Sequence, residues 1–337
     1  MIYLVSKKEL ENITGMGGEM NKKLIILFIT AGFLFYACSE DSVGPEIDSV
    51  QEVIESIDIN SLSTYVKTLS GLQSFNYNGT ETYIETRNWA LEGNAIAADY
   101  IASTLAGFGL EVVDQPFDSL GRNVLGIHRG TLFPDQYYII CAHYDDCGVL
   151  HCIPDSSQLA PGADDNASGT AAVLEAARIL SNYPSRYSLI FALWDEEERG
   201  LYGSLHYAEN ARNNNMSIMG VINLDMIGWN SDADHKAHII VWDTENIPEL
   251  GWKTTEINDD YDIGLNLEFI YRDRGSDFIS FWINEYPAIS IIEDYGDFNT
   301  GYHSINDTFD NMDQTYFLKM SKLAIGMFAD YAFNEQN

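Results

Sequence analysis

Two short segments of the chain, residues 137–142 and 187–194, consist almost entirely of apolar residues. Apolar runs of this length are typical of strands buried on both faces, as in a parallel sheet covered by helices on both sides. Patterns typical of helices follow at residues 168–180 and 201–212, and an amphipathic pattern over residues 314–333 closes the chain. This alternation predicts an α/β fold, a three-layer α/β/α sandwich with a mostly parallel, mixed central sheet.

The same reasoning predicts the remaining elements. Further strands are expected at residues 110–117, 123–128, 219–226, 237–242, 267–271 and 288–293, and further helices at residues 52–69, 92–107 and 277–284 and after Pro248. A chain of 337 residues, of which 46% are hydrophobic, can bury a full core. The sequence from residue 51 onward contains no repeat and no second linker, so residues 51–337 are predicted to form a single domain.

The N-terminal segment has the pattern of a targeting sequence. An apolar run over residues 24–37 follows basic residues. It is shorter than the roughly 20 residues that a spanning helix needs, so residues 1–37 are predicted to be a signal peptide, with residues 1–19 as sequence upstream of the true start. Cys38 ends the run in a pattern that resembles the lipid-attachment site of bacterial lipoproteins. The polar residues 38–50 are predicted to be a tether.

Export sets the expected location and the state of the cysteines. The chain is predicted to be a cell-envelope lipoprotein at the outer membrane or the cell surface, and a periplasmic or secreted protein and an uncleaved anchor are the alternatives. In an exported chain, the closely spaced Cys147 and Cys152 are predicted to form a local disulfide. Cys141 lies in an apolar run and is predicted to be a buried thiol.

The net charge excludes one class of partner. Lys and Arg number 18 and Asp and Glu number 51, which gives a formal charge of 18 − 51 = −33. Such a chain repels the phosphates of nucleic acids, so no nucleic-acid partner is expected. Contact with a membrane is expected only through the lipid anchor. The sequence indicates no oligomeric state.

Acidic and histidine residues follow several of the predicted strands. They are His143 and Asp145, Asp164 and Asp165, residues 195–198, Asp225, and His303. Because the carboxyl ends of parallel strands meet at one edge of a sheet, these side chains are expected to converge there. Mixed nitrogen and oxygen ligands suit zinc, cobalt or manganese. Two histidines and three carboxylates exceed what one catalytic zinc needs, and they suit two metals bridged by a carboxylate and a water.

The motifs around these residues are specific. They read Cys-Ala-His-Tyr-Asp at 141–145, Pro-Gly-Ala-Asp-Asp-Asn-Ala-Ser-Gly at 161–169, Glu-Glu-Arg-Gly-Leu-Tyr-Gly-Ser at 197–204, Asn-Leu-Asp-Met at 223–226 and Tyr-His-Ser-Ile-Asn-Asp-Thr at 302–308. In this order and at these separations they resemble peptidase family 28, which includes zinc aminopeptidases, glutamate carboxypeptidases and glutaminyl cyclases. The resemblance covers roughly residues 90–337.

The resemblance implies a role for each residue. Five residues would bind two zinc ions. His143 and Asp225 would bind the first ion, Glu198 and His303 would bind the second, and Asp165 would bind both. Glu197 would be the general base that activates a water bridging the two ions. Asp145 would hydrogen-bond the other ring nitrogen of His143 and so orient it. The resemblance also implies a cis peptide bond after Asp165.

The expected function is that of a zinc aminopeptidase, which releases an N-terminal, apolar residue from a peptide substrate. Tyr295 or Tyr302 could stabilise the developing oxyanion. Phe278 stands where relatives often carry His after Ser-Asp, and it predicts an apolar wall in the pocket. A carboxypeptidase or dipeptidase, a glutaminyl cyclase and a non-catalytic binding protein remain alternatives. Zinc content separates them, because two ions favour a hydrolase, one a cyclase and none a binding protein.

Overall fold

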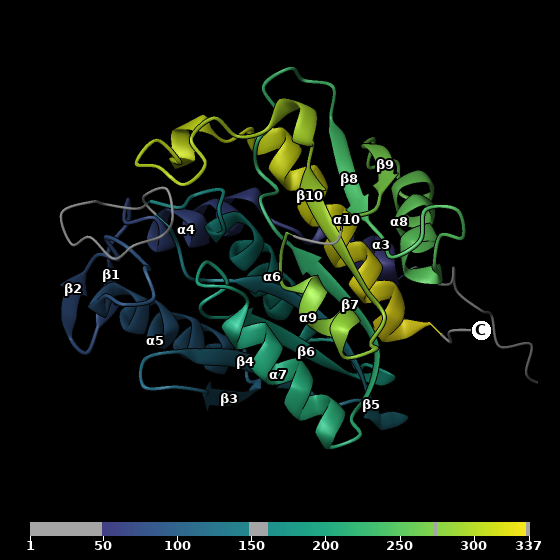
Figure 1. Cartoon of the computed structure of the whole chain (residues 1–337), viewed down its shortest axis with the longest axis horizontal. Helices are drawn as coiled ribbons and strands as arrows, with labels where there is room; N and C mark the ends of the chain where they lie inside the picture. The colour runs from purple at the N-terminus through teal and green to yellow at the C-terminus, as the bar shows by residue number, and fades with distance from the viewer. Residues whose placement is uncertain (1–48, 148–160, 273–274, 335–337) are drawn as a thin grey trace, which may run out of the picture. The chain divides into compact units, whose positions relative to one another are not determined.

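An eight-stranded mixed sheet forms the centre of the molecule. The computed structural model describes residues 49–147, 161–272 and 275–334. The strands of the sheet are β3 (Glu111–Pro116), β4 (Arg122–His128), β5 (Phe133–His143), β6 (Tyr187–Trp194), β7 (Ser217–Leu224), β8 (Lys236–Ile240), β9 (Asn266–Ile270) and β10 (Ala288–Glu293). They lie in the order β3-β4-β6-β5-β7-β10-β8-β9 (Figure 1). The central strands β6, β5, β7 and β10 run parallel, and β4 and β8 flank them in the antiparallel direction.

Helices cover both faces of this sheet. They are α3 (Ser49–Glu55), α4 (Ile59–Leu69), α5 (Glu92–Gly107), α6 (Ala167–Leu180), α7 (Tyr202–Asn213), α8 (Glu249–Asp260), α9 (Phe278–Ile283) and α10 (Gln314–Phe333). The helices α7 and α9 pack on one face, and α6 and α10 cover the central strands on the other (Figure 1). The predicted three-layer α/β/α sandwich with a mostly parallel, mixed sheet is confirmed.

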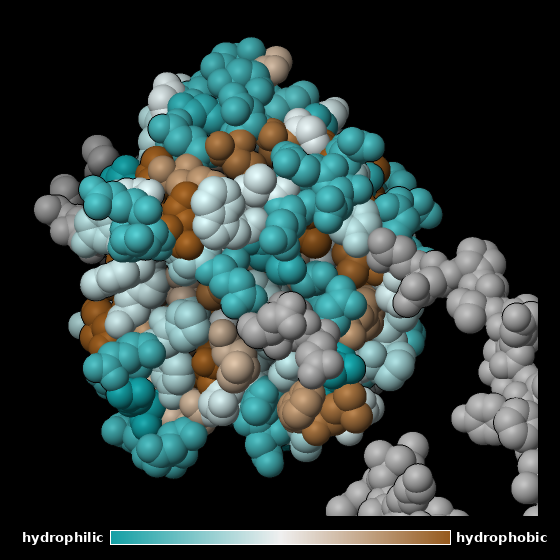
Figure 2. Space-filling model, turned by 90° about the vertical axis from the view of Figure 1, so that its right-hand side faces the viewer, coloured by the Kyte–Doolittle hydropathy of each residue, from teal (hydrophilic) through white to brown (hydrophobic). Residues whose placement is uncertain are grey.

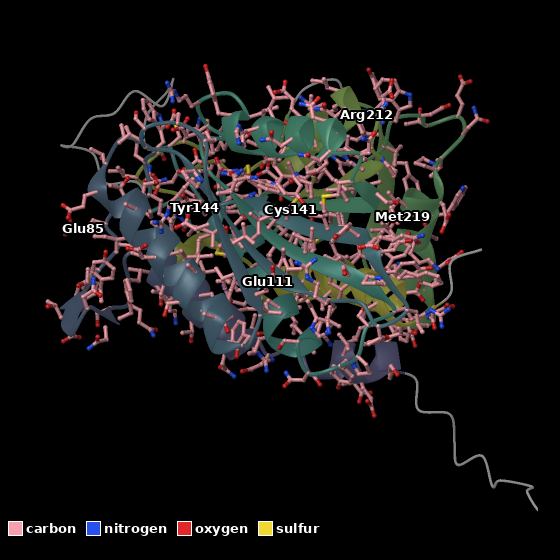
Figure 3. The ribbon with its side chains drawn as sticks, turned by 90° about the horizontal axis from the view of Figure 1, so that it is seen from below. Glu85, Glu111, Cys141, Tyr144, Arg212 and Met219 are labelled. Carbon is pink, nitrogen blue, oxygen red and sulfur yellow. The ribbon has the colours of Figure 1, made fainter. Side chains whose placement is uncertain are left out.

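Side chains alternate between the two faces of the buried strands, so the sheet forms one apolar core with each of the two helical layers. On β5, Ile140 and Ala142 belong to the core under α6 and α10, whereas Ile139 and Cys141 belong to the core under α7 and α9. Every residue of β6 is buried for the same reason. Figure 3 shows Cys141 in the interior of the molecule and Arg212, from α7, at its surface. The unbroken apolar runs in the sequence therefore reflect burial on both faces.

Two local features differ from the prediction. The helix expected over residues 52–69 is interrupted, because the Asp58 carboxylate accepts the backbone N–H groups of Asn60 and Ser61 at 3.1 and 3.2 Å and so starts a new helix, α4. A hairpin of β1 (Phe75–Tyr77) and β2 (Thr80–Thr82) was not predicted. Its turn is Asn78-Gly79, with φ of 53° and 85°, which is the pair that favours a two-residue hairpin turn.

Several predictions concern residues outside the described ranges. The signal peptide over residues 1–37, the lipid site Cys38 and the cysteine Cys152 all lie there. Among the described residues, no helix combines the length and the apolar character needed to cross a membrane. Hydrophilic residues predominate on the face shown in Figure 2, where apolar residues form small, separate patches. This surface suits a chain with a formal charge of −33.

Candidate metal centre

The carboxyl edge of the parallel strands carries the residues that were expected to converge. His143 is the last residue of β5, and Asp225 follows the last residue of β7. Glu198 lies in the loop between β6 and α7. Asp165 precedes Asn166, whose side chain caps α6 by accepting the N–H of Gly169 at 2.9 Å. The predicted cis peptide bond between Asp165 and Asn166 is present.

Asp165 faces both histidines through different oxygens. Its Oδ1 lies 3.3 Å from Nε2 of His143, which in turn lies 3.5 Å from Oδ1 of Asp225. Its Oδ2 lies 3.2 Å from Nε2 of His303, which lies 3.0 Å from Oε2 of Glu198. The five predicted ligands therefore form two groups that share the Asp165 carboxylate.

These separations fit zinc. Zinc bonds of roughly 2.0–2.1 Å in tetrahedral geometry place neighbouring ligand atoms about 3.3–3.4 Å apart. The four distances within the two groups lie between 3.0 and 3.5 Å. The donor set, which combines imidazole nitrogens with carboxylates, is also one that zinc accepts. The residues present thus fit a pair of zinc ions bridged by Asp165.

The charge of the site points the same way. Burial disfavours a charged imidazole, yet the neighbouring Asp165 and Glu198 carboxylates raise the pKa of His303 to about 10. The pKa of His143 is likewise raised by its carboxylate neighbours, in spite of burial. The carboxylates around both rings therefore favour positive charge between them, and bound zinc would supply that charge.

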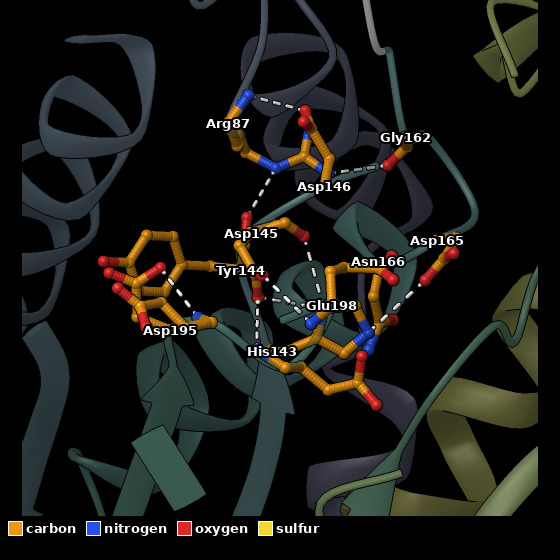
Figure 4. Close-up of polar contacts among 12 residues, drawn as sticks. Arg87, His143, Tyr144, Asp145, Asp146, Gly162, Asp165, Asn166, Asp195 and Glu198 are labelled. Carbon is orange, nitrogen blue, oxygen red and sulfur yellow. Dashed lines mark hydrogen bonds and ion pairs between the residues drawn. The ribbon is translucent and has the colours of Figure 1, made fainter. Parts of the chain in front are cut away.

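Asp145 links the two strand ends that carry ligands. Its Oδ1 lies 3.4 Å from Nδ1 of His143, and its backbone oxygen lies 3.2 Å from the same nitrogen. Its carboxylate also accepts the backbone N–H groups of Glu197 and Glu198, at 3.1 and 3.2 Å (Figure 4). Asp145 therefore orients the imidazole and also holds the loop that supplies the adjacent glutamates.

Glu197 lies beside the ligands and faces a cavity. The residue before it, Glu196, has a φ of 57°, which turns the chain sharply after β6. The Glu197 side chain lines a cavity of about 310 Å³ that also includes four of the five ligands. Burial raises the pKa of its carboxyl group. A carboxylate with this placement can accept a proton from a water held among the ligands.

Aromatic and apolar side chains form much of the remaining wall of this cavity, together with Arg272, Ser276 and Ser290. Phe278 lines it, as expected for an apolar wall. Tyr302 stacks on His303 with ring centroids 3.7 Å apart. Tyr295 lies under the guanidinium of Arg272, at 4.0 Å from the ring centroid. Both tyrosines line the cavity.

Comparison with known proteins identifies the family. The sequence model of Peptidase family M28 matches residues 123–328, a segment that contains every predicted zinc ligand. This chain belongs to peptidase family M28.

Two of the similar proteins are fungal. A probable zinc metalloprotease of Pyrenophora teres f. teres is 27% identical over 298 residues, which cover 74% of this chain and 60% of that protein. A probable zinc metalloprotease of Leptosphaeria maculans is 27% identical over 291 residues, which cover 73% of this chain and 66% of that protein. The chain therefore spans less than two thirds of the length of these M28 relatives.

Solved structures share the fold at low sequence identity. The LapA aminopeptidase of Legionella pneumophila superposes with a TM-score of 0.72 and 19% identity, covering 90% of this chain and 80% of that one. A leucine aminopeptidase precursor and a glutaminyl cyclase, both of Bacteroides thetaiotaomicron, each superpose with a TM-score of 0.67 and 20% identity. Each alignment covers 83% of this chain. It covers 98% of the aminopeptidase precursor and 99% of the cyclase. Aminopeptidases and a cyclase match about equally well, so this likeness defines the fold and not the reaction.

The sequence analysis did not identify Arg87, which holds two loops of the M28 site in place. Its fully buried guanidinium donates to the carbonyl oxygens of Tyr144 at 2.7 Å and Gly162 at 2.8 Å (Figure 4). It also lies 3.6 Å from the buried Asp146 carboxylate. Arg87 thus joins the loop after His143 to the loop before Asp165. A single arginine outside every motif gives no signal in the sequence.

Asp277 is another buried residue to which the sequence analysis assigned no role. It is fully buried at the start of α9, and burial raises the pKa of its carboxyl group to about 7. Its charge also contributes to the raised pKa of Glu197. The position of Asp277 directly before Phe278 in the Ser-Asp pair is the signal that could have drawn attention to it.

A third network holds the loop that carries His303. Asp307 accepts the backbone N–H groups of Asp164 and Asp165, at 3.0 and 2.9 Å. Asn299 donates to both Asp164 and Asp307, at 3.0 and 3.2 Å. Two carboxylates and an amide therefore fix Asp165, which both ligand groups share, relative to the loop of His303.

The cysteines agree with the prediction as far as they are described. Cys141 is a buried free thiol. Cys147 is disulfide-bonded, and Cys152 lies outside the described residues, so the pairing of these two residues stays a prediction. The sulfur of Cys147 lies within 4.8 Å of ligand atoms of Glu198 and His303. The bonded sulfur therefore borders the second ligand group.

Proposed function

We propose that this protein is a zinc-dependent exopeptidase that holds two zinc ions and removes residues from the N-termini of peptides. One observation carries the proposal, namely the Asp165 carboxylate shared by the His143–Asp225 group and the His303–Glu198 group at 3.0 to 3.5 Å. A single-metal site would leave one of these groups as an unexplained cluster of buried charges.

Each side chain of the site has a separate role in peptide hydrolysis. Bound zinc would lower the pKa of a water and polarise the carbonyl group of the scissile bond. Glu197 accepts the proton of the attacking water and donates it to the amine that leaves. Asp145 keeps the His143 ring in one orientation, and Tyr302 or Tyr295 can donate a hydrogen bond to the developing oxyanion.

The cavity supports a preference for the N-terminus of a peptide. Its volume of about 310 Å³ is at the small end for ligand pockets, which suits one residue better than a length of chain. Glu197 lines it and is not one of the proposed zinc ligands, so its negative charge is available to attract an α-ammonium group and to repel a terminal carboxylate.

A carboxypeptidase is the second candidate, and Arg272 is the observation that favours it. Its guanidinium lines the same cavity and lies over the Tyr295 ring at 4.0 Å. A guanidinium in this place could bind a terminal carboxylate through two hydrogen bonds. If the enzyme is a carboxypeptidase, Arg272→Met should raise KM sharply for free C-terminal peptides.

Assays with four substrates and a measurement of zinc content test these proposals. Zinc content is measured by mass spectrometry on the full chain, and hydrolysis is followed for a free peptide, an N-acetylated peptide, a C-amidated peptide and a peptide with N-terminal Gln. Two zinc ions per chain with loss of activity only on N-acetylation supports the aminopeptidase. Loss only on C-amidation supports the carboxypeptidase. Conversion of N-terminal Gln to pyroglutamate with one zinc ion would instead support a cyclase.

We also propose that the mature protein is exported and anchored to the cell envelope through a lipid on Cys38, as the sequence indicates. Replacing Cys38 by Ser should then move the protein from the membrane fraction to the soluble fraction. A variant that stays in the membrane fraction, together with a wild type that carries no lipid by mass spectrometry, contradicts the anchor.

A further inference from the structure

A second pocket lies toward the edge of the sheet opposite the metal centre. It encloses about 370 Å³, and its lining shares no residue with that of the catalytic cavity. The lining includes Ala288, the first residue of β10, and Trp242, which lies two residues after the end of the antiparallel β8. Ala288 pairs with Val221 of β7, four residues before Asp225. About 13 Å of strand therefore separates this pocket from the ligands.

Three aromatic side chains line the pocket, and contacts within the protein hold their rings in place. The Trp282 indole donates through Nε1 to the carbonyl oxygen of Ala288 at 2.9 Å, and the Tyr286 hydroxyl donates to that of Met216 at 3.0 Å. The ring of Trp242 is nearly perpendicular to that of Trp282, with an interplanar angle of 86° and centroids 5.3 Å apart. Two of the three side chains thus use their polar atoms inside the protein, so they offer ring surface to a ligand.

The rest of the lining is also largely apolar. It consists of two prolines, a leucine, an alanine and one charged residue, Glu285. Trp242 is 63% exposed, which is unusual for a side chain of this size. Exposed aromatic rings around a concave, apolar site are typical of ligand-binding pockets. The pocket therefore suits a ligand with an apolar surface.

The charges around the pocket select the sign of that ligand. The two segments that line it, residues 242–250 and 282–288, contain four acidic residues and no lysine or arginine. The acidic residues are Asp243, Glu245, Glu249 and Glu285. Arg212, at the surface in Figure 3, pairs with Glu285 alone among them. Negative charge therefore remains beside the rings, in a chain with a formal charge of −33, and it attracts cations and repels anions.

We propose that this pocket binds an alkylated ammonium cation, the kind of group that choline carries. The faces of indole and phenol rings are negative and attract such a cation. Its alkyl groups bury against the rings and the prolines, while the acidic residues nearby balance its charge. The site is separate from the metal centre, so the proposal does not depend on the reaction that the metal centre performs.

The hydrogen-bonding groups of the lining favour an alkylated ammonium over two other ligands. The primary ammonium of lysine is strongly hydrated and carries three donors, but Glu285, the charged residue of the lining, already pairs with Arg212. A sugar stacks on aromatic rings but brings several hydroxyl groups that need partners, and Trp282 and Tyr286 have committed theirs. A quaternary ammonium has no N–H donor, so it needs none of these partners.

The test compares choline with its neutral isostere, in which a carbon atom replaces the nitrogen. The full chain is produced with fluorinated tryptophan, and the fluorine NMR signals of its six tryptophans are assigned by single substitutions. Choline should shift the signals of Trp242 and Trp282 with a dissociation constant at least about tenfold below that of the isostere. No tryptophan lines the catalytic cavity as the structure describes it, so a cation bound there is distinguished from one bound in this pocket.

Two variants place the site. Trp242→Leu should weaken choline binding several-fold, as measured on the Trp282 signal. Trp252→Leu is the matched control, because Trp252 is also exposed, at 51%, and packs on Phe269 with centroids 5.8 Å apart, but does not line the pocket. This variant should bind choline like the wild type.

Four results would overturn the proposal. They are the absence of a choline-dependent shift at Trp242 and Trp282, equal binding of choline and its isostere, tighter binding of lysine methyl amide than of choline, and an equal loss of choline binding in Trp252→Leu and Trp242→Leu. The first three are measured on the wild type, so they decide the proposal even if a variant folds poorly.

Discussion

The carboxylate of Asp145 accepts the backbone N–H of Glu198 at 3.2 Å while its other oxygen lies 3.4 Å from Nδ1 of His143. One buried side chain therefore sets the geometry of a ligand in each of the two groups. Because Glu198 and His143 come from the ends of neighbouring strands, β6 and β5, the relative position of the groups depends on this residue.

The first prediction concerns that residue. Asp145→Asn places an amide where two backbone N–H donors and an imidazole require acceptors, so at least one of these contacts is lost. We expect the affinity for zinc to fall by about 10- to 100-fold, the usual effect of removing a group that orients a ligand. Competition with a chelating dye measures this. Asp310→Asn, at an exposed position, should leave the affinity unchanged, and equal affinities for Asp145→Asn and the wild type would rule out the positioning role.

The second prediction separates Glu197 from Glu198. Glu197→Gln keeps shape and hydrogen bonding but removes basicity, so turnover should fall by about 10²- to 10⁴-fold with the zinc content intact. Glu198→Ala removes a ligand and should lower both zinc content and turnover. Zinc content and kcat are measured on the same preparations. A Glu197→Gln protein that lacks zinc, beside a fully loaded Glu198→Ala protein, would mean that the two roles are reversed.

The third prediction concerns the buried pair of Arg87 and Asp146. Arg87→Met leaves Asp146 without its partner and several carbonyl groups without a donor, so we expect the free energy of unfolding to fall by about 3–5 kcal/mol. Urea titration followed by circular dichroism measures this. Arg129→Met, which breaks an exposed ion pair with Glu111, should cost at most about 1 kcal/mol. Similar losses for the two variants would show that burial of the Arg87 pair is unimportant.

The fourth prediction is a pH dependence caused by Glu293. Burial, with the adjacent Asp164 charge, raises the pKa of its carboxyl group well above the ordinary value of 4.5. The folded protein thus holds a proton that the unfolded chain releases near pH 4.5. The contribution of Glu293 to the free energy of unfolding should be fully present below that pH and be lost as pH rises through the folded-state pKa, by at most about 1.4 kcal/mol per unit.

Glu293→Gln mimics the protonated form and isolates this effect. An amide can still accept from the backbone N–H of Asn299, which lies 2.8 Å from one carboxylate oxygen, and can donate to Asp164. Its NH₂ group cannot accept from the backbone N–H of Trp229, which lies 3.2 Å from the other oxygen, so the two proteins are compared by the slope of stability against pH and not by absolute stability. The decline in stability above pH 4.5 should therefore be shallower in the variant than in the wild type. Urea titrations of both proteins between pH 4 and 8 give the comparison, and parallel curves would exclude Glu293 as the source.

Local sequence patterns were sufficient for most of the fold. The strands β6 and β10 and the helix α10 have the bounds that the apolar periodicity indicated. The break at Asp58 and the Asn78-Gly79 hairpin were missed although both have local signals, a helix cap and a turn pair. Those two errors came from reading periodicity alone, and they did not affect the sheet.

The sequence by itself also determined which residues come together at the metal centre. Their places after successive strands indicated that these segments converge, because parallel strands bring their carboxyl ends to one edge. The resemblance to the family indicated which residue of each segment would bind zinc. Only the tertiary structure decided which groups support and shape the site. Arg87 meets its partner Gly162 across 75 residues of chain, and Asn223 meets Ser276 across 53. Such contacts follow from how the layers pack, because burial removes water and leaves each polar group dependent on partners that no local pattern specifies.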